Sequence, residues 1–130
     1  MKSIIQTLHG IEGLLTLGPV DAHEITKAET ELAVSFSPEY KDYTQTFGAV
    51  SFNGKDFTGV VQPASLSVVE VTRAARKITP AASPEWYVVM DPHFDGIIIW
   101  QGKDGMIYQT GPGMQPEKVA ETLEEYMRKA

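Results

Sequence analysis

Residues 25–48 read ITKAETELAVSFSPEYKDYTQTFG, and this stretch predicts two short consecutive helices. Thr26 and Glu29 have the spacing of a capping box, in which the threonine oxygen accepts a first-turn amide and the glutamate reaches back. Ser37 can cap the second helix, with Pro38 at the first helical position, where its missing N–H would have had no helical partner. The stretch therefore predicts a helix pair with a defined start for each member.

Both predicted helices carry a stripe that a core can bury, with residues repeating at helical spacing. The stripes are Ile25, Ala28 and Leu32 in the first helix, and Tyr40, Tyr43, Thr44 and Phe47 in the second. Gly48 ends the second helix, because glycine adopts left-handed backbone without a steric penalty. We expect most aromatic side chains in the core, with one or two, such as Tyr43 or Trp100, reaching the surface.

The rest of the chain predicts a sheet followed by a closing helix. The predicted elements are a helix within residues 1–11, strands at 49–52, 57–61, 66–71, 86–90, 96–101 and 106–109, a helical turn over 73–78, and a last helix from Pro116. Asn53-Gly54 predicts a tight hairpin, and the unbroken apolar run Ile97–Trp100 predicts a strand covered on both faces. The order predicts one α+β domain over residues 1–130, with N-terminal helices, a central antiparallel sheet of about four to six strands, and a C-terminal helix packed on it.

Composition excludes several classes of function. The chain has 130 residues, of which 42% are apolar, and no cysteine, so disulfides, thiolate metal sites and cysteine nucleophiles are absent. Eleven basic and seventeen acidic side chains give a net charge of −6, which argues against direct nucleic-acid binding and favours a basic partner. Polar residues interrupt the N-terminal apolar stretch, and no segment approaches the ~20 apolar residues of a membrane span, so we expect a cytoplasmic protein without membrane contact.

Asp91-Pro92-His93-Phe94-Asp95 places a histidine midway between two carboxylates, each two residues away. This pattern suits a divalent metal or acid–base site, but it equally suits a polar turn with a solvated histidine. We favour the turn, because one segment offers at most three ligands and no second cluster supplies the rest. No nucleophile elbow and no phosphate-binding glycine loop is present, so we expect no catalytic residue, metal or cofactor.

Negative charge gathers in two segments of the sequence. Residues 21–56 contain seven acidic and three basic side chains, and residues 85–104 contain four acidic and one basic. This is either an ordinary solvated surface or an acidic patch that docks a cationic partner. The second hypothesis places the partner contacts at Glu39, Asp42, Tyr43, Asp91, His93 and Asp95.

The order of motifs along the chain resembles the SMI1/KNR4 (SUKH) superfamily. Its members open with a helix of the pattern I-x-x-x-E-x-x-L and a proline-initiated aromatic helix, followed by an apolar strand near a tryptophan and a closing helix. The matching residues are Ile25, Glu29 and Leu32, then Pro38, Tyr40, Tyr43, Phe47 and Gly48, then Ile97–Trp100, Gly105 and Tyr108, and finally Leu123 and Tyr126. Two departures are the long extension through Gly18 and the lack of an asparagine near Gly48.

The resemblance implies a non-enzymatic immunity protein, because bacterial members of the superfamily mostly bind and neutralise toxins. It implies a cognate protein toxin of basic character, of a nuclease type, whose active face is occluded by a monomer or weak homodimer. Two alternatives stay open. One is a small metal-dependent or ligand-binding enzyme that uses Asp91, His93 and Asp95, and the other is an intracellular scaffold of the kind that fungal relatives imply.

Overall fold

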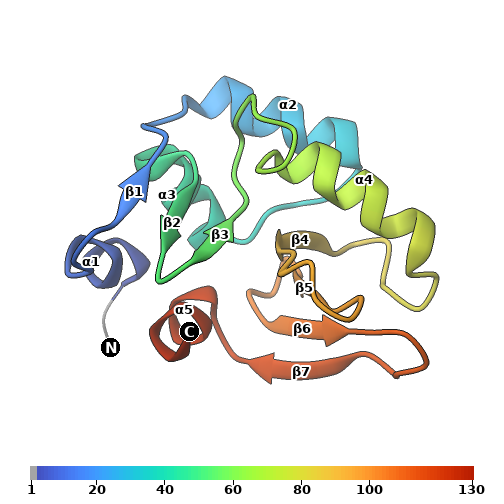
Figure 1. Ribbon diagram of the computed structural model, residues 1–130. Helices are drawn as coiled ribbons and strands as arrows, with labels where there is room; N and C mark the ends of the chain where they lie inside the picture. The colour runs from blue at the N-terminus through green and yellow to red at the C-terminus, as the bar shows by residue number, and fades with distance from the viewer. Residues whose placement is uncertain (1–2) are drawn as a thin grey trace.

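A computed structural model describes residues 3–130, which form helices and two antiparallel sheets (Figure 1). The elements in chain order are α1 (Ile4–His9), β1 (Leu15–Thr16), α2 (Ala22–Leu32), α3 (Pro38–Phe47), β2 (Val50–Phe52), β3 (Lys55–Phe57), α4 (Val68–Ile78), β4 (Tyr87–Met90), β5 (Ile98–Gln101), β6 (Ile107–Thr110), β7 (Glu117–Ala120) and α5 (Leu123–Lys129). The predicted α+β class is confirmed. The strands divide into a three-stranded sheet in the order β1-β2-β3 and a four-stranded sheet in the order β4-β5-β6-β7.

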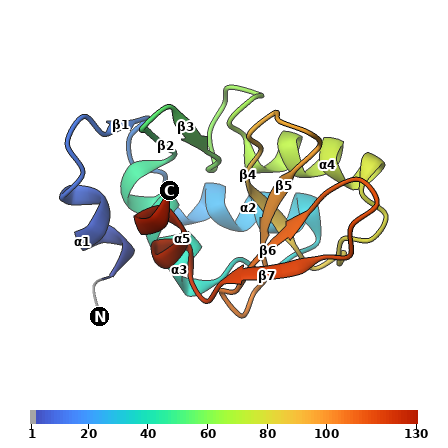
Figure 2. The ribbon, with the colours of Figure 1, turned by 60° about the horizontal axis from the view of Figure 1, so that its bottom comes forward.

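The helices lie in two groups. Figure 1 shows α2 and α4 side by side along the top of the molecule, whereas α1 and α5 lie at its lower left. Figure 2 shows α5 beside α1 and directly after β7, so the closing helix packs at the edge of the four-stranded sheet. Helix α1 agrees with the helix predicted within residues 1–11 over its described part, and it buries Ile4 and Leu8.

Helix α3 forms as predicted from local signals. The Ser37 hydroxyl accepts the Tyr40 N–H at 3.0 Å, Pro38 starts the helix, and the predicted stripe is buried. Gly48 follows with φ +76°, and a Cβ there would collide with the backbone oxygen of Gly18. The helix therefore ends at a position where both the conformation and the close backbone approach require glycine.

Helix α2 starts earlier than predicted. Its N-cap is Asp21, whose carboxylate accepts the Glu24 N–H at 2.9 Å, so the predicted capping box at Thr26 is wrong. Asp21 and Glu24 have the same three-residue spacing, and nothing between them and Thr26 breaks a helix, so the helix extends back to the earlier cap. The stripe Ile25, Ala28 and Leu32 is buried as predicted.

Two segments differ in type from the prediction. Residues 66–71 were predicted as a strand, but Ser67 caps α4, because Val68, Thr72 and Ala75 have helical spacing and all face the core. A helix was predicted from Pro116, but residues 117–120 pair with β6 as β7. Helix α5 then begins after Thr122, whose hydroxyl accepts the Glu125 N–H at 3.0 Å. In each case the side chains suited both states, and tertiary pairing decided between them.

The hairpin at Asn53-Gly54 is confirmed, with φ of +52° and +73° at its two turn residues. Its return strand, β3 at Lys55–Phe57, begins and ends earlier than the predicted 57–61, because Thr58 leaves the hairpin and joins the other sheet. The Thr58 N–H donates to the Val89 oxygen at 2.9 Å, and the Thr58 hydroxyl donates to the Val88 oxygen at 2.7 Å. Thr58 therefore connects the two sheets.

The core has two parts on opposite faces of β4 and β5. The larger part lies among α1, α2, α3, α5 and the hairpin, and it holds most aromatic residues. The smaller part lies under α4 and contains Ala75, Val88, Ile98 and Trp100. Every residue of β4 and β5 is buried, which confirms the strand predicted to be covered on both faces. Tyr43 and Trp100 are both fully buried, so the expectation that one of them reaches the surface is wrong.

Candidate partner-binding surface

Two of the six residues predicted to contact a partner are part of the fold. The Tyr43 hydroxyl donates to the Thr58 oxygen at 2.6 Å and accepts the Val50 N–H at 3.2 Å, and its ring has no exposed surface. Burial holds the pKa of this hydroxyl well above its usual value, so it stays neutral and bonded. Tyr43 joins α3 to the hairpin and offers nothing to a partner.

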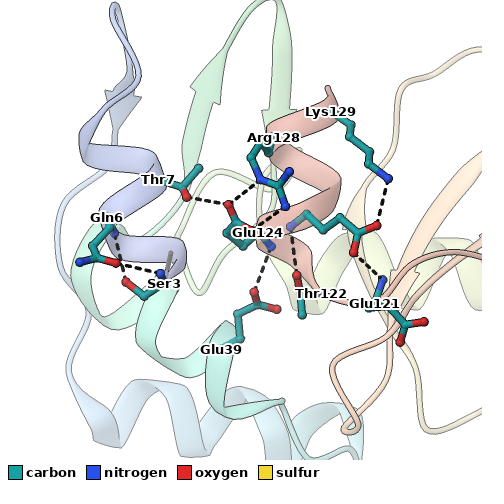
Figure 3. Close-up of polar contacts among 10 residues, drawn as sticks. Ser3, Gln6, Thr7, Glu39, Glu121, Thr122, Glu124, Arg128 and Lys129 are labelled. Atoms are coloured by element: carbon teal, nitrogen blue, oxygen red, sulfur yellow. Dashed lines mark hydrogen bonds and ion pairs between the residues drawn. The ribbon is translucent and has the colours of Figure 1, made fainter. Parts of the chain in front are cut away.

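Glu39 also has a role in the fold. Its carboxylate accepts the backbone N–H of Glu124 at 2.9 Å (Figure 3) and that of Leu123 at 2.8 Å. It also accepts a hydrogen bond from the Gln101 amide at 3.0 Å. A carboxylate at the first N–H groups of a helix satisfies donors that have no helical partner and matches the helix dipole. Glu39 therefore fixes the start of α5 instead of facing solvent.

The buried carboxylate of Glu124 extends this arrangement. The Thr7 hydroxyl donates to it at 2.7 Å, and the Arg128 guanidinium donates to both of its oxygens at 3.0 and 3.3 Å (Figure 3). These contacts join α1 to α5 through a largely buried group. The acidic residues at this end of the molecule therefore hold α1, α3 and α5 together.

The other predicted residues are exposed or half-buried. Asp42 lies exposed on the outer side of α3, at the same helix as Glu39. Asp91, His93 and Asp95 lie in the loop 91–96 between β4 and β5, which starts at the opposite end of β4 from Tyr87, the partner of Gln101 in the sheet. The structure therefore does not bring Glu39 and this loop together into one acidic patch.

The loop 91–96 has an unusual backbone. His93 and Asp95 have φ of +54° and +53°, and the following glycine is also left-handed. The Asp91 carboxylate accepts the His93 N–H at 2.9 Å, which fixes the first turn of the loop. Across residues 3–130, no three His, Cys, Asp or Glu side chains are grouped so that they could hold a metal ion. The alternative of a metal-dependent site at this loop has no geometric support.

An apolar groove of about 370 Å³ runs between this loop and α4. Val71, Ala74, Ala75 and Ile98 form its apolar lining, and Ile78 stands at its edge with 70% of its surface exposed. The charged or titratable residues that line it are Glu70, Asp91 and His93. Two of the predicted contact residues therefore border an apolar groove that the sequence did not reveal.

A second, polar groove of about 680 Å³ lies between α2 and the segment that leads into α4. Its charged lining residues are Asp21, Glu24, Lys27, Glu31 and Glu70. Ala64 and Glu70 line both grooves, so the two grooves adjoin at these residues. We call the surface formed by the two grooves and the loop 91–96 the α2–α4 face; Figure 1 shows its two helices side by side.

The α2–α4 face is predominantly acidic. Lys27 is the one basic residue among those that line the grooves, whereas five lining residues are acidic. Arg73 lies next to the polar groove and pairs with Glu31 at 3.8 Å and with Glu70 at 3.4 Å. Such exposed pairs are weak and easily exchanged, so the face keeps a net negative charge that attracts cations.

Sequence reasoning found only part of this face. It located Asp91, His93 and Asp95, and it counted Asp21, Glu24 and Glu31 in an acidic segment without selecting them. Glu70 was missed, because its segment was predicted as a strand. The exposed Phe94 and Ile78 could have been found only by knowing which apolar residues the core leaves out.

Comparisons with known proteins agree with the fold and identify the family. A crystal structure of a protein from Pseudomonas syringae pv. tomato is similar over 98% of this chain and 95% of that chain, with a TM-score of 0.77 and 16% sequence identity. That likeness concerns the fold. None of the curated proteins matches this chain. Among residues 3–130, no helix has the length and apolar character to cross a membrane. The family model SUKH_5, described as SMI1-KNR4 cell-wall, matches residues 1–130, so the chain belongs to the SMI1/KNR4 (SUKH) family.

Proposed function

We propose that this protein is a non-enzymatic immunity protein, which binds a cognate bacterial toxin and neutralises it by covering the toxin's active face. Membership of the SUKH family carries the proposal, because the resemblance described above implies toxin binding for bacterial members. The acidic α2–α4 face supports it, since two adjoining grooves lined by carboxylates suit a basic protein surface.

The toxin is proposed to be basic and of a nuclease type. A nuclease active site is built to hold phosphates, and a row of carboxylates presents comparable negative charge to it. We propose as contacts the exposed Asp42, His93 and Asp95 and the half-buried Asp91, whereas Glu39 and Tyr43 are omitted. We propose that the protein acts in the cytoplasm as a monomer or weak homodimer, where it would meet a toxin that enters or is made in the cell.

The proposal is tested with the toxin domain encoded by the neighbouring reading frame. Purified toxin domain is titrated with this protein while cleavage of a labelled nucleic acid and complex formation by size-exclusion chromatography are followed together. We expect a stoichiometric complex and a loss of cleavage that reaches completion at one equivalent. A complex that cleaves as fast as the free toxin, or no complex at micromolar concentrations, would overturn the proposal.

A further inference from the structure

Helix α4 has a second apolar stripe beside the one that faces the core. Val68, Thr72 and Ala75 face the sheet, whereas Val71, Ala74 and Ile78 follow each other at i, i+3 and i+7 along the wall of the apolar groove. Ile78 is among the most exposed large apolar residues of the described chain. A stripe with this spacing fits the apolar face of another helix, and the small Ala74 at its centre allows close approach.

The loop 91–96 forms the opposite wall of the groove. Asp91 and His93 line it, and the next residue, Phe94, has 67% of its surface exposed. Two large apolar side chains are thus left open to water, Ile78 in the groove and Phe94 in the loop that forms its opposite wall. Exposed apolar groups rimmed by polar residues mark surfaces that another molecule covers.

The charges around the groove indicate which kind of molecule is complementary to it. Glu70 and Asp91 line it and Asp95 follows in the same loop, while no lysine or arginine is among the lining residues. Two basic residues of α4 are already engaged: Arg73 pairs with Glu31 of α2 and with Glu70, and Arg76 donates to the Leu32 and Pro84 oxygens. An apolar floor between carboxylates is complementary to an apolar anchor flanked by Lys or Arg, and it repels phosphates.

We propose that the partner docks through a cationic amphipathic segment, whose apolar side chains enter the groove between α4 and the loop 91–96. Its Lys or Arg residues meet Glu70, Asp91 and Asp95, and the chain continues along the polar groove toward Asp21 and Glu24. This inference rests on the proposed function in that the segment belongs to the toxin. In this binding mode an amphipathic helix lies in the groove, and its apolar side chains at helical spacing are the anchors.

The first experiment tests the chemistry of the surface without the toxin. Isotope-labelled protein is titrated with a short amphipathic peptide of lysine and leucine, and NMR chemical shifts are followed. We expect shifts at Ala74, Ile78 and the loop 91–96, extending to Glu24. A peptide with glutamate in place of lysine, and one with serine in place of leucine, should each bind at least about tenfold more weakly. If the serine peptide binds as tightly as the lysine–leucine peptide, binding is non-specific charge attraction and the inference is overturned.

The second experiment tests whether the toxin uses this surface. Ile78→Ser and Asp91→Lys should each weaken binding of the toxin domain about tenfold or more, measured by titration calorimetry. Matched controls are Leu15→Ser, an equally exposed apolar residue on β1, and Glu117→Lys, an exposed carboxylate on β7; both should leave the affinity unchanged. Thermal unfolding of each variant checks that the fold is retained.

A direct contact can also be recorded, because the chain contains no cysteine. Ala74→Cys carrying a photoreactive label should crosslink to a toxin peptide that contains Lys or Arg beside an apolar residue, whereas Gln45→Cys on α3 should not. If the toxin binds, but the Ile78 and Asp91 variants keep the parent affinity and Ala74→Cys gives no crosslink, this inference is refuted and the immunity proposal stands. A peptide that maps to the groove while the toxin domain does not bind refutes the immunity proposal and supports the docking chemistry.

Discussion

The interior between α3 and β4 and the α2–α4 face use their polar groups in opposite ways. In the interior, the hydroxyls of Tyr40, Tyr43 and Tyr87 are fully buried, and each has hydrogen-bond partners within 3.2 Å. On the α2–α4 face, the carboxylates of Glu24 and Asp95 are exposed, and the exposed Phe94 precedes Asp95 in the chain. Buried polar groups are costly unless paired, so the interior fixes one arrangement of its elements.

We therefore expect the interior to determine stability and the α2–α4 face to determine partner affinity. Removing a partner inside leaves a buried donor or acceptor unsatisfied, which lowers the free energy of unfolding. Removing an exposed carboxylate of the face that caps no helix or turn, such as that of Glu24, affects the fold little, so any loss appears in partner affinity. Substitutions in the two regions should therefore separate cleanly, with stability responding to one and binding to the other.

Alkaline pH should give the largest effect, and it acts chiefly through the buried tyrosines of the interior. Burial raises the pKa of Tyr40, Tyr43 and Tyr87 well above the ordinary value of about 10. Their contribution to stability is therefore complete below about pH 10 and is lost as pH rises toward the folded-state pKa, because only the unfolded chain ionises. Above about pH 10, ionisation of each tyrosine in the unfolded chain lowers the unfolding free energy by about 1.4 kcal/mol per pH unit. The three together therefore lower it by about 4 kcal/mol per pH unit.

The measurement is urea unfolding in a pH series from about pH 9 to about pH 11. Tyr43→Phe should reduce the slope of unfolding free energy against pH by about a third, since one of three groups is removed. Tyrosinate absorbance should appear together with unfolding. Ionisation of all five tyrosines near pH 10 in a protein that stays folded would contradict the burial of this cluster.

Glu39 and Asp42 provide a matched pair on one helix, with the next largest effect. Glu39→Ala removes the carboxylate that accepts the Leu123, Glu124 and Gln101 donors, and it should lower the unfolding free energy by about 3 kcal/mol. Asp42→Ala should change it by less than about 0.5 kcal/mol, because Asp42 is an exposed residue away from such contacts.

Urea unfolding of both variants measures the difference, and hydrogen exchange of the α5 amides locates it. Faster exchange in α5 of Glu39→Ala is the expected signature, since the helix loses its N-terminal partner. Equal stability of the two variants would mean that Glu39 does not hold α5.

The sequence predicts well what local chemistry decides. Helix α3 combines a serine cap, a proline at its start and an aromatic stripe, and all three signals agree. The second half of helix α4 was predicted as a helical turn over residues 73–78, but its first half was predicted as a strand, because Val68 and Val69 favour strands locally. The spacing that buries Val68, Thr72 and Ala75 acts through the tertiary fold. The role of Glu39 depends on residues more than eighty positions later, and no local pattern signals such a contact.

The α2–α4 face shows the same division. Asp91 and His93 were found because charge and turn residues gather within one segment. The groove beside them was not predicted, since it arises from α4, the loop 91–96 and β5, which meet only after folding. Asp21 and Glu24 come from another part of the chain and join the face through Glu70 and Ala64, which line both grooves.

The smallest effect concerns backbone strain, and it distinguishes strain at the face from strain elsewhere. Ala33 ends α2 with φ +55°, and Asp95 has φ +53° in the loop. Left-handed backbone is unfavourable for residues with a Cβ, so Ala33→Gly should raise the unfolding free energy by about 1 kcal/mol. Asp95→Gly should raise it by about 0.5 kcal/mol, because aspartate tolerates this conformation better than alanine does.

Only the loop variant should carry a cost in binding. Asp95→Gly removes a carboxylate of the α2–α4 face and frees the loop, so toxin affinity should fall severalfold even though the fold becomes more stable. Ala33→Gly removes no charge and lies outside the face, so its affinity should match that of the parent protein. Urea unfolding and titration calorimetry measure the two quantities. If Asp95→Gly binds as tightly as the parent, the loop is outside the interface; if Ala33→Gly also binds weakly, stability and binding are not separate in this protein.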